Sequence, residues 1–284
     1  MVVQPGAGMF QPVARAPRLT AAICDVLREI DVLDECGERR LIDVPAERPL
    51  TLFVDGLELV TLMTLGASPE LLVLGYLHNQ RLIADVAEIE SIEVDWNASA
   101  AKVMTRSGAH PILAGTAGRL GTTGCGLGTV FGGLRGQMEG MRLPATDAAR
   151  VSQRGLYRVL EIMFEQESLH RSAGSVHGCA LFHDAELLVF VEDVGRHNAI
   201  DTLSGWMAFH GVAGGDKLFY TTGRLSGEMV IKAAQVGVPI FVSRNGVTAM
   251  GLDVASQLGM TLIGRAVKRR FICYVGSERF DGEP

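Results

Sequence analysis

The C-terminal half of the chain alternates short apolar runs with segments in which apolar positions recur every three or four residues. Bounded apolar runs predict buried strands, and the longer spacing predicts helices packed on them. After an amphipathic helix over residues 147–174, the predicted strands are SVHGCALFH, ELLVFVEDV, KLFYTTG, PIFVS, TLIGRAV and RRFICYV, and the helices between them are NAIDTLSGWMAFHG, SGEMVIKAAQVG and TAMGLDVASQLG. This order indicates an α/β fold for residues 146–284, a three-layer core in which helices cover a mostly parallel sheet.

The N-terminal half shows a different pattern. Residues 1–20 are rich in Pro, Gly and Ala without a period, which predicts a flexible arm. The elements expected after the arm are a short helix over residues 21–36, antiparallel strands over 39–60 that turn at Asp55-Gly56, a helix that begins at Ser68-Pro69, and a strand pair over 89–105. Residues 21–106 are therefore predicted to form a small α+β subdomain.

A glycine-rich segment over residues 107–145 separates the two halves. It lacks any period, which is typical of a long functional loop or a linker. Cys125 lies within it, in the stretch TTGCGLG, and Arg119 and Arg135 flank the glycines. Exposure and nearby positive charge favour the nucleophilic thiolate. On residues alone, a reactive thiol on a mobile loop and an incidental cysteine in a linker are equally well supported.

Composition narrows the class of protein. The 284 residues are 48% hydrophobic, and the formal charge of −6 argues against general nucleic-acid binding. The five cysteines are scattered, with neither zinc-ligand spacing nor a disulfide-dense pattern, so no zinc is expected. No signal segment and no apolar run of membrane-spanning length is found, which predicts a cytoplasmic protein outside the membrane.

Three loops of the C-terminal half repeat one design. Each follows a predicted strand, precedes a predicted helix, and contains a glycine, an arginine and a residue suited to N-capping; they read EDVGRHN with Arg196, His197 and Asn198, TGRLSGE with Arg224 and Ser226, and SRNGVT with Arg244 and Thr248. Helix N-termini attract anions, and carboxyl ends of strands share one edge. Any one such loop is common in α/β proteins, but the repetition predicts a shared site for a polyanion, such as a nucleotide or another phosphate-bearing cofactor.

Other candidate residues are less specific. The turn over Gly264–Arg270 holds four cations within six residues, typical of a solvated turn or of a cover over phosphates. His197 suits acid–base chemistry, a phosphate contact or simple loop capping. The absence of a P-loop element argues against a P-loop NTPase. His177-Gly178-Cys179 lacks the glutamate and the later Pro-Cys-x-x-Cys of zinc deaminases, so Cys179 is predicted to be a buried strand residue, as is Cys273.

Four segments together resemble one known family. RPLTLFVDGLELVTLMTL, SVHGCALF, EDVGRHNAID and TGRLSGEMVIKAAQVGVPI are similar, in order, to the FdhD family of formate dehydrogenase accessory sulfurtransferases, and the resemblance spans about residues 40–275. It implies a cytidine-deaminase-like core without zinc and a homodimer. It further implies that Cys125 receives sulfur as a persulfide from a cysteine desulfurase and delivers it to bis-molybdopterin guanine dinucleotide, the cofactor of the apo formate dehydrogenase, for which a guanine nucleotide can substitute. The family's cofactor contacts fall on Arg265, Ala266, Val267, Lys268, Arg269 and Arg270.

The chain departs from this family in the cysteine loop. The family pattern is Thr-Gly-Cys-Gly-x-Cys-Gly, whereas Gly128 stands here at the second cysteine position and Thr129 at the glycine that follows. A two-cysteine relay in the loop is therefore excluded. Two hypotheses follow: sulfur transfer by Cys125 alone, and a binding protein that holds the mature cofactor for insertion without covalent chemistry.

Overall fold

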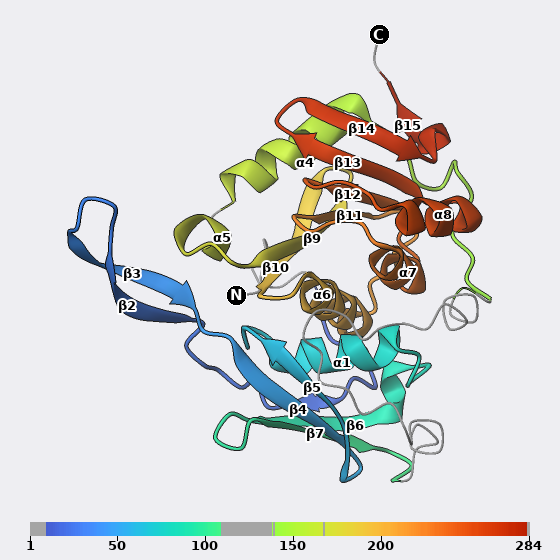
Figure 1. The fold of residues 1–284 in the computed structure, drawn as a ribbon. Helices are drawn as coiled ribbons and strands as arrows, with labels where there is room; N and C mark the ends of the chain where they lie inside the picture. The colour runs from blue at the N-terminus through green and yellow to red at the C-terminus, as the bar shows by residue number, and fades with distance from the viewer. Residues whose placement is uncertain (1–9, 109–137, 139, 167, 283–284) are drawn as a thin grey trace.

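The computed structural model describes residues 10–108, 138, 140–166 and 168–282, and these form a mixed α/β structure built on two larger sheets (Figure 1). The first sheet has the strand order β1-β6-β7-β4-β5, with β1 (Arg18–Leu19), β4 (Arg48–Val54), β5 (Leu57–Thr64), β6 (Ile89–Asp95) and β7 (Ala100–Thr105). Helix α1 (Pro69–Asn79) packs on it around a core that includes Leu50, Leu62 and Leu74. The hairpin predicted at Asp55-Gly56 joins β4 and β5 through two residues of positive φ.

The second sheet has six strands in the order β10-β9-β11-β12-β13-β14. Their bounds are β9 (His177–His183), β10 (Glu186–Asp193), β11 (Leu218–Thr221), β12 (Ile240–Ser243), β13 (Thr261–Val267) and β14 (Arg270–Val275). The prediction of a mostly parallel sheet is wrong, because only β11–β12 and β12–β13 pair parallel, while the other three pairs are antiparallel. The two terminal pairs are hairpins, whose short turns force neighbouring strands to run in opposite directions.

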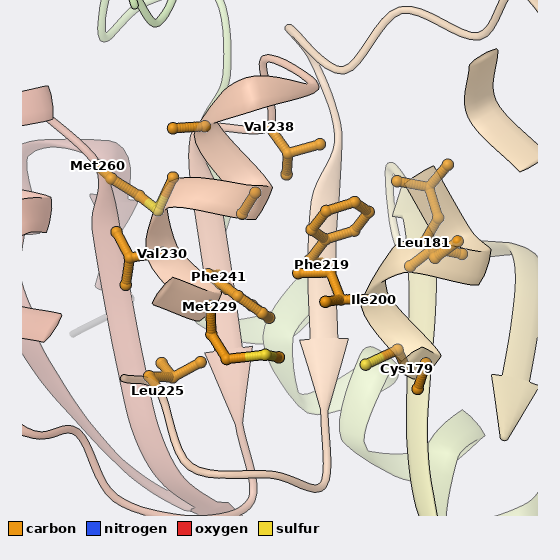
Figure 2. Close-up of a cluster of buried hydrophobic side chains, with 14 of the residues drawn as sticks. Cys179, Leu181, Ile200, Phe219, Leu225, Met229, Val230, Val238, Phe241 and Met260 are labelled. Carbon is orange, nitrogen blue, oxygen red and sulfur yellow. The ribbon is translucent and has the colours of Figure 1, made fainter. Parts of the chain in front are cut away.

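Helices cover both faces of the six-stranded sheet, so the predicted three layers are found. The helices of this half are α4 (Gln153–Glu165), α5 (Leu169–Ser172), α6 (Arg196–His210), α7 (Gly227–Gln235) and α8 (Ala249–Leu258). Side chains alternate across the sheet: Cys179 and Leu181 point to the core under α6, α7 and α8 (Figure 2), whereas Ala180 and Phe182 join the core under α4. Cytidine-deaminase topology stays a prediction.

Helices α1 and α6 join the two halves of the molecule, and α1 lies between α6 and the smaller sheet (Figure 1). Their backbones touch through two glycines. A Cβ on Gly75 would lie 1.8 Å from the carbonyl oxygen of Asp201, and one on Gly205 would lie 1.9 Å from that of Leu71. Neither position therefore admits a larger residue unless the helices separate.

Three element predictions need correction. The predicted helix over 21–36 is wrong: β2 (Leu27–Leu33) pairs there with β3 (Arg39–Pro45), because a partner strand is available and β-branched residues such as Ile30 and Val32 favour strands. The predicted arm over 1–20 includes β1, which pairs with β6. The helix over 147–174 is broken, since α4 ends at Glu165 and Ser168 caps α5, whose Arg171 N–H it accepts at 3.3 Å.

Two short strands and two 3-10 turns complete the fold. They are β8 (Val151–Ser152), which pairs with β15 (Phe280–Asp281), and the 3-10 turns Val86–Glu88 and Ser277–Arg279. No helix among the described residues combines the length and the apolar character required to cross a membrane.

Candidate functional site

The carboxyl ends of four strands lie along one edge of the six-stranded sheet. β10 and β11 both pair antiparallel with β9 and so run in the same direction, and β12 and β13 continue parallel to β11. The loops after the first three of these strands, residues 194–198, 222–226 and 244–248, therefore meet at this edge, which we call the carboxyl edge. Residues 265–270, which comprise the end of β13, its turn and the start of β14, lie at the same edge. This edge is where open α/β sheets bind ligands, and the sequence predicted that the arginine loops would share it.

Short hydrogen bonds tie the loops of the carboxyl edge together. The Asn245 amide donates to the Thr222 carbonyl at 2.9 Å, and the Ser243 hydroxyl donates to the Gly223 carbonyl at 2.5 Å. The Arg265 N–H in turn donates to the Asn245 carbonyl at 2.7 Å. Because backbone groups and short side chains make this frame, the long arginine side chains are left free to meet a ligand.

Three of the loops bring an arginine to the carboxyl edge. Within the described part of the chain, the side chains of Arg196, Arg224 and Arg244 form no hydrogen bond or ion pair. Arg196 lies against Gly223, where a Cβ would come within 2.9 Å of the arginine Cβ, so the glycine makes room for it. Its Nε is buried without a partner. Arg196 is half-buried, whereas Arg224 and Arg244 are exposed. Guanidinium groups that lack a protein partner are suited to bind phosphate or carboxylate.

The pKa values of two neighbouring histidines are lowered in part by the positive charge at this edge. Burial lowers the pKa of His177, and the charges of Arg196, His170 and Arg224 lower it further. For His197, burial together with the charges of Lys232 and Arg196 lowers the pKa to about 3. His197 is therefore neutral at physiological pH, far from the pKa that suits a general acid or base near neutrality.

Glu228 connects His197 to a buried ion pair. His197 Nδ1 lies 3.5 Å from Glu228 Oε1 and has no hydrogen-bond partner among the described residues. Glu228 also faces the Lys232 ammonium group, which binds Asp201 at 2.7 Å with both side chains almost fully buried. Asn79 of α1 donates to the same aspartate at 2.7 Å, so this network reaches from the carboxyl edge into the smaller subdomain.

Asp193 fixes the turn that presents Arg196, a role that the sequence did not reveal. Its buried carboxylate accepts hydrogen bonds from Thr64 and Leu65 at the end of β5, and from Gly195 and Asn198 at the start of α6. Asn198 is not the N-cap that was predicted, because α6 begins at Arg196 with Gly195 at the cap. The only hint was that Asp193 immediately precedes the glycine turn.

The other two predicted caps differ in what their side chains do. Thr248 caps α8 and accepts from the Gly251 N–H at 3.1 Å. Ser226 occupies the N-cap of α7, but its buried hydroxyl caps nothing and has no partner within the described residues. That hydroxyl, like Arg196 Nε, is an unsatisfied polar group at the carboxyl edge, and buried polar groups ordinarily have partners.

A basic segment over residues 265–270, which comprises the end of β13, its turn and the start of β14, extends beyond β12. Arg265 has a positive φ of 50° where the register of β13 and β14 shifts, and Lys268 has a positive φ of 56° in the turn itself. Arg265, Val267, Lys268, Arg269 and Arg270 are exposed, whereas Ala266 is buried in the core below α4. Arg269 lies over the ring of Tyr157, 5.6 Å from its centre. Ala266 can therefore contact a ligand only through its backbone. The guanidinium group of Arg269 already contacts the Tyr157 ring.

Comparison with known proteins now decides the family. A model of the FdhD/NarQ family matches residues 45–281. The chain belongs to this family. The resemblance found in the sequence is thereby confirmed, and its four segments all lie within the match.

Relatives support the assignment, and a solved structure shares the fold. The chain is 32% identical over 233 residues to a sulfur carrier protein FdhD of Bacillus licheniformis, covering 82% of this chain and 88% of the relative. It is 30% identical over 237 residues to one of Geobacillus kaustophilus, covering 84% and 89%. The crystal structure of a putative formate dehydrogenase accessory protein from Desulfotalea psychrophila superposes with a TM-score of 0.72 at 24% identity, over 90% of this chain and 98% of that one.

The thiols of this FdhD-family chain fall into different environments. Cys125 lies outside the described residues. Cys179 is buried as predicted, and burial raises its pKa to about 12, although its Sγ donates to Thr221 Oγ1 at 3.3 Å. Cys273 is only half-buried rather than buried. The described residues contain no group of three or more His, Cys, Asp and Glu side chains placed to hold a metal ion.

Proposed function

We propose that this protein carries sulfur for the maturation of formate dehydrogenase. In this proposal Cys125 attacks the persulfide of a cysteine desulfurase, takes the outer sulfur as its own persulfide, and releases the desulfurase thiolate. The sulfur then passes to bis-molybdopterin guanine dinucleotide, the client cofactor of the apo formate dehydrogenase. We place the protein in the cytoplasm as a homodimer. The FdhD/NarQ match supports the carrier role, since curated relatives are sulfur carrier proteins.

The observation that carries the client-binding part is the set of partnerless guanidinium groups at the carboxyl edge. Arg196, Arg224 and Arg244 come from three loops and meet there without counter-ions among the described residues. A ligand with several phosphates would satisfy them, and it would also supply partners for Arg196 Nε and the Ser226 hydroxyl. The residues present therefore fit a guanine dinucleotide.

Each residue of the edge has a proposed part in holding this client. Arg196, Arg224 and Arg244 would bind phosphates, with Ser226 and the neutral His197 as hydrogen-bonding groups. The basic segment over residues 265–270 would contact the nucleotide through the side chains of Arg265, Lys268, Arg269 and Arg270 and through the backbone of Ala266 and Val267. The client itself supplies the metal and dithiolene chemistry.

The sulfur-transfer step is tested by mass. Incubation with a cysteine desulfurase and cysteine should add 32 Da, removable by dithiothreitol, to the peptide that contains Cys125. Cys36 is exposed and so serves as the internal control for nonspecific sulfuration. If Cys125→Ala gains the same mass at the same yield, the carrier mechanism fails.

The client site is tested by binding. Titration with the cofactor, or with GDP as its substitute, should give affinities at least about tenfold weaker for Arg265→Ala and Arg270→Ala, the equivalent of about 1.4 kcal/mol each. Arg18→Ala is the matched control, because Arg18 is an exposed arginine on the other sheet. Equal loss in the control, or no binding by the unaltered protein, contradicts the site.

A second function is favoured by one feature of the sequence. Gly128 replaces the second loop cysteine, so a protein that only holds the mature cofactor and docks with the apo-dehydrogenase would need no thiol. Full maturation of formate dehydrogenase by Cys125→Ala supports that function. Loss of maturation with intact cofactor binding supports the sulfur carrier.

A further inference from the structure

His177 lies at the carboxyl edge, but the proposed client site does not use it. It is the first residue of β9, and in the register of the sheet it lies opposite Asp193, the last residue of β10. Side chains alternate along a strand, so His177 points to the same side of the sheet as Cys179, under the helices α6, α7 and α8 (Figure 2). The imidazole therefore lies on the side of the sheet where these helices begin.

The loop after β11 connects this imidazole to two of the arginines. His177 Nδ1 lies 3.4 Å from the hydroxyl oxygen of Thr222. The next residue, Gly223, packs against the side chain of Arg196, and Arg224 follows it. The positive charges of both arginines act on His177. Three consecutive residues thus bring an imidazole and two guanidinium groups close together.

Thr222 suits either protonation state of this histidine. Its hydroxyl accepts from the Gly178 N–H at 3.0 Å and keeps one lone pair and its own hydrogen. It can donate to Nδ1 of the neutral ring, and it can accept from the Nδ1–H of the imidazolium. Nε2 forms no hydrogen bond with any residue that the structure describes, so this nitrogen is left for a ligand.

The groups around His177 favour its neutral form. Burial lowers the pKa of His177, and the charges of Arg196 on α6, His170 on α5 and Arg224 lower it further. Asp193, opposite on β10, is buried and already accepts two hydrogen bonds on each carboxylate oxygen, so its lone pairs are occupied. A phosphate at this edge would add negative charge beside the ring and raise its pKa.

Two other ionisable groups near this ring do not respond to a ligand in the same way. His197 has a pKa of about 3, so it stays neutral near pH 7. Glu192 of β10 points to the other side of the sheet, where its oxygens accept two backbone N–H groups of α5 at 2.7 and 3.1 Å. His177 and the exposed His170 are therefore the groups whose charge a phosphate can change, and of these two His177 contacts an arginine loop through Thr222.

We propose that His177 is a further phosphate-binding residue of the carboxyl edge and that it takes up a proton from solvent when the phosphates bind. The imidazolium then donates from Nε2 to a phosphate oxygen, while Thr222 accepts from Nδ1. Protons and phosphates therefore strengthen each other's binding, and the affinity for the client falls as the pH rises between the pKa of His177 in the free protein and that in the complex. This inference rests on the proposed client site and adds a residue and a pH dependence to it.

Replacement by glutamine separates proton uptake from simple hydrogen bonding, because glutamine keeps an N–H near the position of Nε2 but takes up no proton. Inorganic pyrophosphate and GDP are titrated into the full-length protein by calorimetry at pH 6 and pH 8. Titration at pH 6.5 in two buffers of different ionisation enthalpy counts the protons taken up. His183→Gln is the matched control, since it removes a histidine from the other end of β9, and His170→Gln removes the exposed histidine of α5. Thermal melts check that each variant is folded.

Lowering the pH from 8 to 6 should strengthen binding to the unaltered protein at least about threefold more than binding to His177→Gln, and the unaltered protein should take up about half a proton more per ligand. Both controls should behave as the unaltered protein does. Equal pH dependence in His177→Gln, or loss of that dependence in either control, overturns the inference and leaves the client site standing if Arg265→Ala still weakens binding. Proton uptake through His177 with pyrophosphate but no binding of GDP overturns the client instead, and binding of neither probe overturns both.

Discussion

Acid should destabilise this protein through the buried, neutral His197. Its pKa in the folded state is about 3, mainly because of burial and then because of the charges of Lys232 and Arg196. In the unfolded chain the pKa returns to about 6.5. Between these values the unfolded state binds a proton that the folded state refuses, so the free energy of unfolding falls as the pH falls below 6.5.

The size of this effect follows from the two pKa values. Each unit of pH between them is worth about 1.4 kcal/mol. Moving from pH 7 to pH 5 crosses about 1.5 units of that window, so His197 should account for about 2 kcal/mol of lost stability. Burial also lowers the pKa values of His78, His177 and His210, so part of the pH dependence will remain when His197 is replaced.

Urea unfolding at pH 7 and pH 5 measures this contribution. The loss of stability between the two pH values should be about 2 kcal/mol smaller for His197→Gln than for the unaltered protein. The interval from pH 8 to pH 9 is the control, because His197 is neutral there in both the folded and the unfolded state, so His197→Gln should leave the change in stability across it unaltered. If His197→Gln loses as much stability on acidification as the unaltered protein, then His197 is not held neutral in the folded state.

Two further predictions concern the joint between the halves of the molecule. Gly205→Ala should lower the free energy of unfolding by about 3 kcal/mol, because its Cβ would clash with the α1 backbone. Gly246→Ala is the control and should change that free energy little, because the space around Gly246 is open. Equal effects of the two substitutions in thermal melts would disprove the close contact. Lys232→Met should lower the free energy of unfolding by about 3–5 kcal/mol, because it leaves the buried Asp201 carboxylate without its ion pair. Adding Asp201→Asn should recover part of that loss. An unfolding curve unchanged by Lys232→Met would show that the pair contributes nothing to stability.

The sequence predicts the central α/β unit well because its local signals agree with the fold. Each of β11, β12 and β13 is a short apolar run, and the helices between them begin at Ser226 and Thr248 as expected. The antiparallel hairpin of β9 and β10 lacked such a signal. Its turn uses positive φ at Asp184 and Ala185, and alanine is not a residue from which a tight turn is predicted.

Contacts between distant segments explain what the sequence could not predict. The α1–α6 contact depends on Gly75 and Gly205, which are 130 positions apart and give no local pattern. Asp193 looks like any polar residue at a strand end, yet it joins the end of β5 to the start of α6. The arginine loops were predictable because loops after parallel strands must meet at one edge, whichever hairpins flank them.

The thiols of the described residues bear on whether one loop cysteine is enough. Cys179 lies close to the carboxyl edge, but it is buried and its pKa of about 12 keeps it a thiol, so it cannot attack a persulfide as a thiolate. Burial also raises the pKa values of the half-buried Cys24 and Cys273. Cys36 is exposed, but it lies at the tip of the hairpin of β2 and β3, away from the six-stranded sheet. If Cys125 carries sulfur, it must therefore hand it directly to the client, because no thiol at the carboxyl edge can take the place of the cysteine that Gly128 has replaced.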